Sequence, residues 1–149
     1  MYDSFIIAIV GRPNVGKSRL FNRLSSSTQA IVRDEEGVTR DRQYARGVWY
    51  DHYYTVIDTG GFLPATEEPI LVSMRRQARL AIEEADAILF VMDGRAGLTP
   101  GDREIARLLR ESEKPVFHVV NKIDTTHLEG SLLADFYQLG AELYPLSAE

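Results

Sequence analysis

Cysteine is absent from the sequence, and tryptophan and histidine are scarce, with one and three residues. Without thiols the chain can hold neither a disulfide nor a thiolate metal site. The histidines His52, His118 and His127 do not share the spacing of metal ligands, so we expect them to be structural or exposed. The chain opens at Met1 with an apolar run of only residues 5–10, which is too short for a signal peptide or a membrane span. We therefore expect a cytoplasmic protein without membrane contact.

An excess of positive charge is lacking as well, since the formal net charge is −5. This balance argues against a domain that holds nucleic acid by bulk electrostatics alone. With 149 residues, 44% hydrophobic and 26% charged, the chain can bury the core of a single domain, residues 1–149.

Short apolar runs alternate with amphipathic, charged stretches, as in crossover units on a parallel sheet. We expect strands at 5–10, 44–50, 53–58, 87–93, 115–120 and 142–146. Helices are expected at 17–25, 69–84, 102–112 and 129–139, with Pro69 and Asp102 as start signals. The predicted fold is α/β, with a mixed, mostly parallel six-stranded sheet flanked by helices.

A tight turn between the second and third of these strands predicts that one strand is antiparallel to the rest. The aromatic residues around it are Trp49, Tyr50, Tyr53 and Tyr54. We interpret them as cross-strand and core packing groups, with a base-stacking platform as the less favoured alternative.

Residues 11–18 read GRPNVGKS, a complete G-x-x-x-x-G-K-[ST] phosphate loop directly after the first apolar run. A strand that turns into a helix here would aim several backbone N–H groups and the helix dipole at one anion. Gly11 and Gly16 allow close backbone approach, Lys17 can reach the β and γ phosphates, and the Ser18 hydroxyl can bind Mg²⁺. The pattern predicts a nucleotide-phosphate site in a P-loop fold.

A second motif, DTGG at 58–61, ends the strand expected at 53–58. Ligands of open α/β sheets lie outside the carboxyl ends of the strands, so Asp58 should emerge beside the phosphate loop and hold Mg²⁺ through water. The N–H of Gly61 can meet a γ phosphate. Alone, these four residues would be an ordinary turn.

A third motif, NKID at 121–124, follows the strand expected at 115–120. The Asp124 carboxylate can accept hydrogen bonds from N1–H and N2–H₂ of guanine, and adenine offers no matching pair. Asn121 and Lys122 complete the motif. It is a weak signal alone, but its order after the other two favours guanine and disfavours an ATP-using kinase or ATPase.

Together these motifs resemble a translation-factor-class GTPase domain, and closely the first G domain of the EngA (Der) family of ribosome-associated GTPases. The segments DEEGVTRDR at 34–42, ADAILFVMD at 85–93 and Ser147-Ala148 extend the likeness over the chain. The resemblance implies that Thr39 joins Mg²⁺ in the GTP state and that the Ala148 N–H contacts guanine O6. It assigns further nucleotide contacts to Asn14, Val15, Arg19 and Ser147. We expect the Arg19 side chain to face solvent.

One position departs from the pattern of many small GTPases: Phe62 stands where a glutamine would orient the attacking water. The resemblance implies that K⁺, held partly by Asn14, supplies the missing positive charge. The expected catalytic set is therefore Lys17, Asn14, Thr39 and Gly61.

Two functions follow from these features. The leading hypothesis is a GTPase switch in which GTP and Mg²⁺ order residues 26–45 and 59–68, and hydrolysis to GDP releases them. By resemblance, this GTPase would act in large ribosomal subunit assembly. The chain would be a piece of a longer protein with two G domains that contacts ribosomal RNA, and we expect the piece to be monomeric. The alternative is a slow or inactive guanine-nucleotide module that regulates neighbouring domains. The arginine run Arg75, Arg76 and Arg79 is interpreted as a solvated helix face, with an RNA contact as the alternative.

Overall fold

The computed structural model describes residues 5–12, 16–24, 43–49, 51–60, 69–121, 134–140 and 142–145. Six strands form one sheet in the order β2-β3-β1-β4-β5-β6. Only the β2–β3 pair is antiparallel; the other four pairings are parallel. The strands are β1 (Phe5–Gly11), β2 (Gln43–Trp49), β3 (His52–Asp58), β4 (Ala87–Asp93), β5 (Val116–Asn121) and β6 (Leu143–Pro145). The mixed, mostly parallel sheet predicted from the sequence is confirmed.

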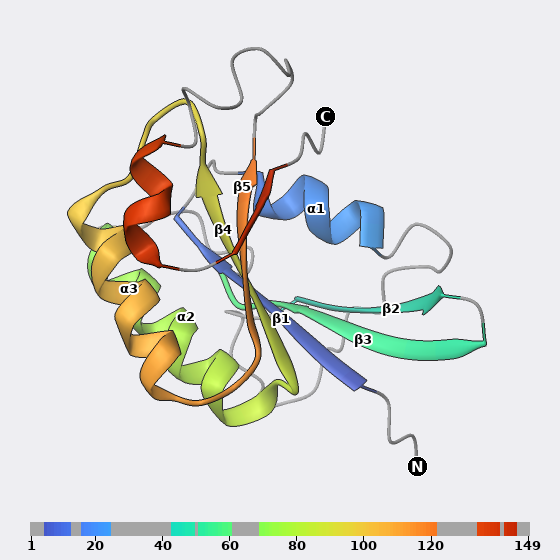
Figure 1. Ribbon diagram of the computed structural model, residues 1–149. Coiled ribbons are helices and arrows are strands. Elements are labelled where there is room, and N and C mark those ends of the chain that lie inside the picture. The colour runs from blue at the N-terminus through green and yellow to red at the C-terminus, as the bar shows by residue number, and fades with distance from the viewer. Residues whose placement is uncertain are drawn as a thin grey trace.

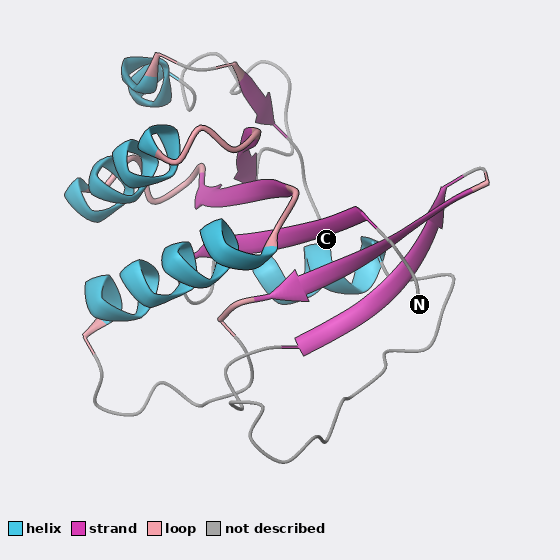
Figure 2. Ribbon diagram, turned by 90° about the horizontal axis from the view of Figure 1, so that it is seen from below, coloured by secondary structure: helices cyan, strands magenta, loops and turns pink. Residues whose placement is uncertain are grey.

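Helices cover both faces of this sheet (Figure 1). On one face lie α2 (Ile70–Glu84), α3 (Pro100–Glu111) and the 3₁₀ helix η1 (Ala134–Leu139), and on the other lies α1 (Lys17–Leu24). Figure 2 shows the same layers from below, with the β2–β3 hairpin at one edge. Within the described ranges, no helix combines the length and apolarity needed to cross a membrane.

The alternation of side chains along β1 builds a core on each side of the sheet. Ala8 and Val10 belong to the larger core cluster beneath α2 and α3, whereas Ile9 belongs to a smaller cluster with Leu20 and Phe21 of α1. Central parallel strands covered on both faces are apolar along most of their length. This explains why β4 and the end of β1 were predictable from unbroken apolar runs.

The helix boundaries differ from the expectations at two places. Helix α3 begins at Pro100 rather than at Asp102, because Thr99 is its N-cap and Asp102 occupies the third helical position. Asp102 donates its backbone N–H to Thr99 Oγ1 at 3.0 Å, and its Oδ2 accepts from the Thr99 N–H at 3.0 Å, which forms a capping box.

The helix expected at 129–139 is described only from residue 134, and there it is 3₁₀ rather than α. Its buried residues, Phe136 and Leu139, are three apart, which is the repeat of a 3₁₀ helix. Gly140 follows with φ +68° and donates its N–H to Tyr137 O, so the segment closes with an i to i+3 bond. The remaining strand and helix boundaries agree with the expectations to within one residue or two.

Candidate functional site

The three motif segments meet at the carboxyl edge of the sheet. Gly11 ends β1, Asp58 ends β3 and Asn121 ends β5, and these strands run parallel. Helix α1 begins at Lys17, directly beyond β1. Because parallel strands end on the same side of a sheet, residues far apart in the sequence converge here, as the sequence predicted.

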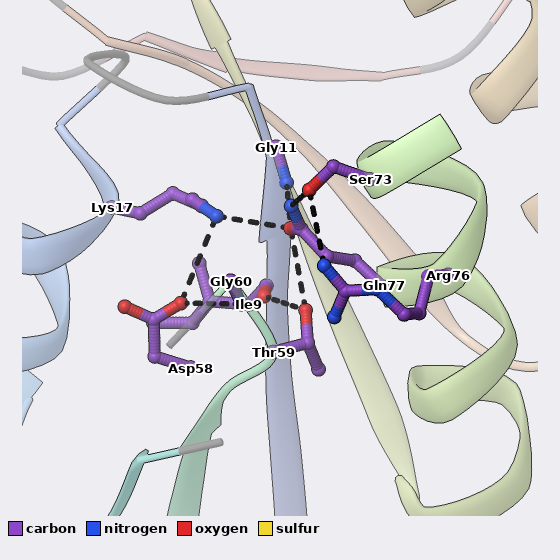
Figure 3. Close-up of polar contacts among 9 residues, drawn as sticks. All are labelled: Ile9, Gly11, Lys17, Asp58, Thr59, Gly60, Ser73, Arg76 and Gln77. Carbon is purple, nitrogen blue, oxygen red and sulfur yellow. Dashed lines mark hydrogen bonds and ion pairs between the residues drawn. The ribbon is translucent and has the colours of Figure 1, made fainter. Parts of the chain in front are cut away.

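Lys17 is a buried cation at the centre of this edge, with 8% of its surface exposed. Its Nζ donates a hydrogen bond to Gln77 Oε1 at 2.9 Å and lies 3.8 Å from Asp58 Oδ1 (Figure 3). Burial lowers the pKa of Lys17; the Asp58 carboxylate opposes this shift and the Arg76 guanidinium adds to it. The site therefore holds a desolvated ammonium between one carboxylate and one carboxamide.

The backbone around Gly60 closes over this ammonium. The Gly60 N–H donates to Asp58 Oδ1 at 3.0 Å. A Cβ at Gly60 would lie 1.9 Å from Lys17 Nζ, so a side chain here would push the lysine head group away from its place. The turn after β3 thus orients Asp58 and forms one wall of the Lys17 site.

Gly16 joins the phosphate loop to the motif after β5. Its φ is +96°, in the region that side chains rarely adopt, and a Cβ there would lie 1.9 Å from Nδ2 of Asn121. Asn121 is itself buried. The two motifs are therefore in direct contact, although they are separated by about a hundred residues.

Gln77 is the residue at this site that the sequence reasoning missed. Its Oε1 accepts from Lys17 Nζ and from the Gly11 N–H at 3.2 Å, and Thr59 Oγ1 lies 3.4 Å away. Thr59 also donates its hydroxyl to Ile9 O at 2.8 Å. A signal was present: Gln77 is a polar residue on the buried stripe of an otherwise apolar helix face.

The other expected site residues divide between described and undescribed positions. Ser18 and Arg19 lie exposed on the first turn of α1, and the Arg19 side chain faces solvent as expected. Outside the described residues lie Asn14, Val15, Thr39, Gly61, Phe62, Lys122, Asp124, Ser147 and Ala148. The roles assigned to these residues stay predictions.

The arginine run on α2 is only partly a solvated face. Arg79 is exposed, whereas Arg75 and Arg76 are half-buried. Arg75 makes a two-pronged ion pair with Glu104 of α3, which raises the pKa of Arg75 and lowers that of Glu104 through their hydrogen bond. The expectation of a solvated run was therefore wrong for two of the three residues: Arg75 pairs with Glu104 of α3, and Arg76 contacts Ser73 beside the Lys17 site.

The packing expected of the aromatic residues is confirmed for Tyr54 but not for Tyr53, while the Trp49 side chain and Tyr50 lie outside the description; the expectation for the histidines is confirmed for His52 and His118. Tyr54 covers Gly47 across the hairpin and donates its hydroxyl to Leu24 O at 2.6 Å, while Tyr53 is exposed. His118 is buried with its ring edge toward Phe90, at 6.1 Å between centroids. Exposed His52 completes the described histidines, and His127 lies outside the described residues.

Comparison with known proteins places these features in a family. Residues 6–122 match the family described as 50S ribosome-binding GTPase. GTPase Der of Clostridium tetani is 56% identical over 91% of this chain and 31% of its own length. The chain spans about a third of the length of the curated Der proteins it matches.

Solved structures give the same fold. Era of Aquifex aeolicus bound to GDP·AlF₄⁻ aligns with a TM-score of 0.71 and 31% identity, over 96% of this chain and 50% of Era. Era in complex with MgGDPNP and nucleotides 1506–1542 of 16S ribosomal RNA aligns with a TM-score of 0.72 and 32% identity, over 99% and 52%. The sheet order, the phosphate loop and these likenesses agree, and the chain belongs to the 50S ribosome-binding GTPase family as a P-loop G domain of the Der type.

Proposed function

We propose that this chain binds GTP and GDP with Mg²⁺ and hydrolyses GTP to GDP and phosphate as a conformational switch. The observation that carries the proposal is the convergence on Lys17. A buried ammonium, the N-terminus of α1 and the Asp58 carboxylate meet at one edge of the sheet, beside Asn121 of the guanine motif. A desolvated cation at a helix N-terminus is suited to phosphate. The names of the relatives, GTPase Der, support the same reaction.

The donor set fits Mg²⁺, which prefers hard oxygen ligands. Ser18 lies on the first turn of α1 and is exposed, directly after buried Lys17, and the Asp58 carboxylate lies 3.8 Å from Lys17 Nζ. We assign Ser18, Thr39 and Asp58 as the metal-binding residues. Bound there, Mg²⁺ would neutralise charge on the β and γ phosphates.

Guanine selection is assigned to Asn121, Lys122 and Asp124, with Ser147 and Ala148 beside the base. The structure supports this assignment through Asn121, whose side chain abuts Gly16 and so holds the two motifs together. Asp124→Asn should weaken guanine nucleotide binding and permit xanthine nucleotides, because the extra carbonyl of xanthine needs a donor. Unchanged guanine preference in that variant would contradict the base-reading role.

The proposal also covers which groups supply positive charge during GTP hydrolysis. Because Phe62 replaces the glutamine of many small GTPases, we assign the missing charge to K⁺ held by Asn14, together with Lys17, Thr39 and Gly61. GTP turnover should be faster in potassium than in sodium at constant ionic strength, and Asn14→Ala should remove that difference. Equal rates in both salts would reject the potassium mechanism and favour the alternative, a slow guanine-nucleotide module.

The setting of the reaction is inferred from the family. The chain would be the first of two G domains in a longer cytoplasmic protein that acts in large ribosomal subunit assembly. The G domain by itself would be monomeric. The family description, 50S ribosome-binding GTPase, supports the large-subunit setting, and the Era complex with 16S ribosomal RNA supports contact with ribosomal RNA. Guanine nucleotide retained after gentle purification would test base choice and site integrity together. Retention of adenine nucleotide, or Lys17→Ala binding GTP as well as the parent, would overturn the proposal.

A further inference from the structure

Gln77 is a buried carboxamide in the middle of α2. It lies on the same helix stripe as Met74, Ala78 and Ala81, and 1% of its surface is exposed. Burying an amide among apolar side chains is unfavourable unless the amide is hydrogen-bonded. Apolar side chains fill the rest of this stripe, so the hydrogen bonds of Gln77 must account for its presence.

The Gln77 oxygen faces three donors from three separate elements (Figure 3). These are Lys17 Nζ of α1 at 2.9 Å, the N–H of Gly11 at the end of β1 at 3.2 Å, and Thr59 Oγ1 after β3 at 3.4 Å. A carbonyl oxygen has two lone pairs, and Thr59 gives its one hydroxyl proton to Ile9 O at 2.8 Å, so Oε1 accepts from Lys17 and Gly11, with the ammonium at the shorter distance. Gln77 of α2 thereby connects the phosphate-loop lysine, Lys17, to the ends of strands β1 and β3.

The other end of the carboxamide is fixed within α2. Nε2 of Gln77 donates to Ser73 Oγ at 3.3 Å, one turn earlier in the helix. This bond sets which atom of the amide points at Lys17. Gln77 therefore connects Lys17 to the preceding turn of α2 through the two ends of its carboxamide. Among the described residues, Ser73 makes no direct hydrogen bond to Lys17.

We propose that Gln77 is a positioning residue: it holds the Lys17 ammonium in place for phosphate and links α2 to that site. The inference rests on the proposed function. The Lys17 ammonium has three N–H donors, so it can contact a phosphate oxygen while one N–H stays on Oε1 of Gln77. Helix α2 is thus linked to the phosphate site through a single side chain.

Nucleotide affinity provides the first test. With a fluorescent GDP analogue, Gln77→Met should bind about tenfold more weakly, because Lys17 loses its neutral anchor. Gln77→Glu keeps the shape but adds a second carboxylate beside Lys17 and next to the phosphates, so it should bind more weakly still. Val72→Ala, the matched control, changes an exposed side chain of the same helix and should stay within about twofold of the parent. All variants are compared at a temperature where circular dichroism shows them folded.

A ligand-free test separates this inference from the proposed function. If Gln77 and Lys17 act on each other, the fall in Tm of the Lys17→Met, Gln77→Met double variant should be smaller than the sum of the two single falls. Additive falls in Tm, or Gln77→Met and Gln77→Glu binding GDP as tightly as Val72→Ala, would overturn the positioning role. A parent chain that binds no guanine nucleotide but still shows the Tm coupling would instead overturn the proposed function alone.

Discussion

Nε of Arg12 lies 3.7 Å from Oδ1 of Asp102, so the phosphate loop is tied to the first turn of α3 by charge. Asp102 is buried and its other oxygen closes the capping box with Thr99. Neither Nε nor Oδ1 has a hydrogen-bond partner within the described part of the chain. The same carboxylate therefore caps a helix and holds an arginine of the nucleotide motif.

Asp102→Ala should lower the free energy of unfolding by about 2 kcal/mol, because it removes the bond from the Thr99 N–H to Oδ2 and leaves Arg12 without its carboxylate. Thr99→Ala removes only one cap bond and should cost about 1 kcal/mol. Urea unfolding of both variants measures the difference. Equal losses would show that Arg12 gains nothing from Asp102.

Gly60→Ala should weaken GDP binding by about tenfold with little change in Tm, because the new methyl would displace the Lys17 ammonium. Gly101→Ala is the matched control: its Cβ would meet Leu71 and Thr99 at ordinary contact distances of 3.6 and 3.7 Å in helix α3. Fluorescent GDP titration of the two variants is the measurement. Equal GDP affinities of the Gly60→Ala and Gly101→Ala variants would show that Gly60 does not form a wall of the Lys17 site.

Gly16→Ala combines an unfavourable φ with a clash against Asn121, whereas Gly97→Ala has only the unfavourable φ of +81° and meets nothing within 4 Å. The Gly97 variant should lose about 1 kcal/mol of stability. The Gly16 variant should lose clearly more and also bind nucleotide poorly. Thermal unfolding compares them, and similar Tm values would argue against tight packing between the two motifs.

The buried imidazole of His118 should make stability depend on pH. Burial, with a smaller effect of Arg110, lowers the pKa of His118 below the ordinary 6.5. The unfolded chain therefore binds a proton at His118 more readily than the folded chain does. The contribution of neutral His118 to stability is complete above pH 6.5 and is lost as the pH falls from there through the lowered pKa of the folded state. The slope in that window is at most about 1.4 kcal/mol per pH unit.

Replacement at this position tests the sign. His118→Phe keeps an aromatic ring beside Phe90 and should flatten the stability curve between pH 7.5 and 5.5, while His52→Gln at an exposed site should not. Denaturant unfolding at several pH values gives the comparison. A curve that keeps its slope in the His118 variant would assign the dependence to other groups.

The strands and the meeting of the motifs could be predicted because they depend on local patterns. Strand β4 is a continuous apolar run that is buried on both faces, and its predicted bounds match the structure. Asp58 lies beside Lys17 because parallel strands end at a common edge. The predicted start of α3, Asp102, is two residues late. Asp102 is the third helical residue of α3, with Thr99 as the N-cap and Pro100 as the first helical residue.

Gln77 could not be assigned in the same way. A polar residue on an apolar helix stripe signals a buried hydrogen bond, but it does not say which partner it meets. The partner depends on how α2 packs over β1, and this contact is between residues 60 positions apart in the sequence. Tertiary geometry alone joins Gln77 to Lys17.

Helix α1 is only eight residues long, and an isolated helix of that length is not stable in water. It is held by Leu20 and Phe21 in the core and by Tyr54, which bonds to its last residue, Leu24. Lys17, its first residue, therefore acquires its place only when the sheet and this core form. The hydrogen-bonded amides of α1, from Leu20 onward, should therefore exchange much more slowly than those of an isolated helix of this length. The lysine of the phosphate loop is then placed by contacts made further along its own helix.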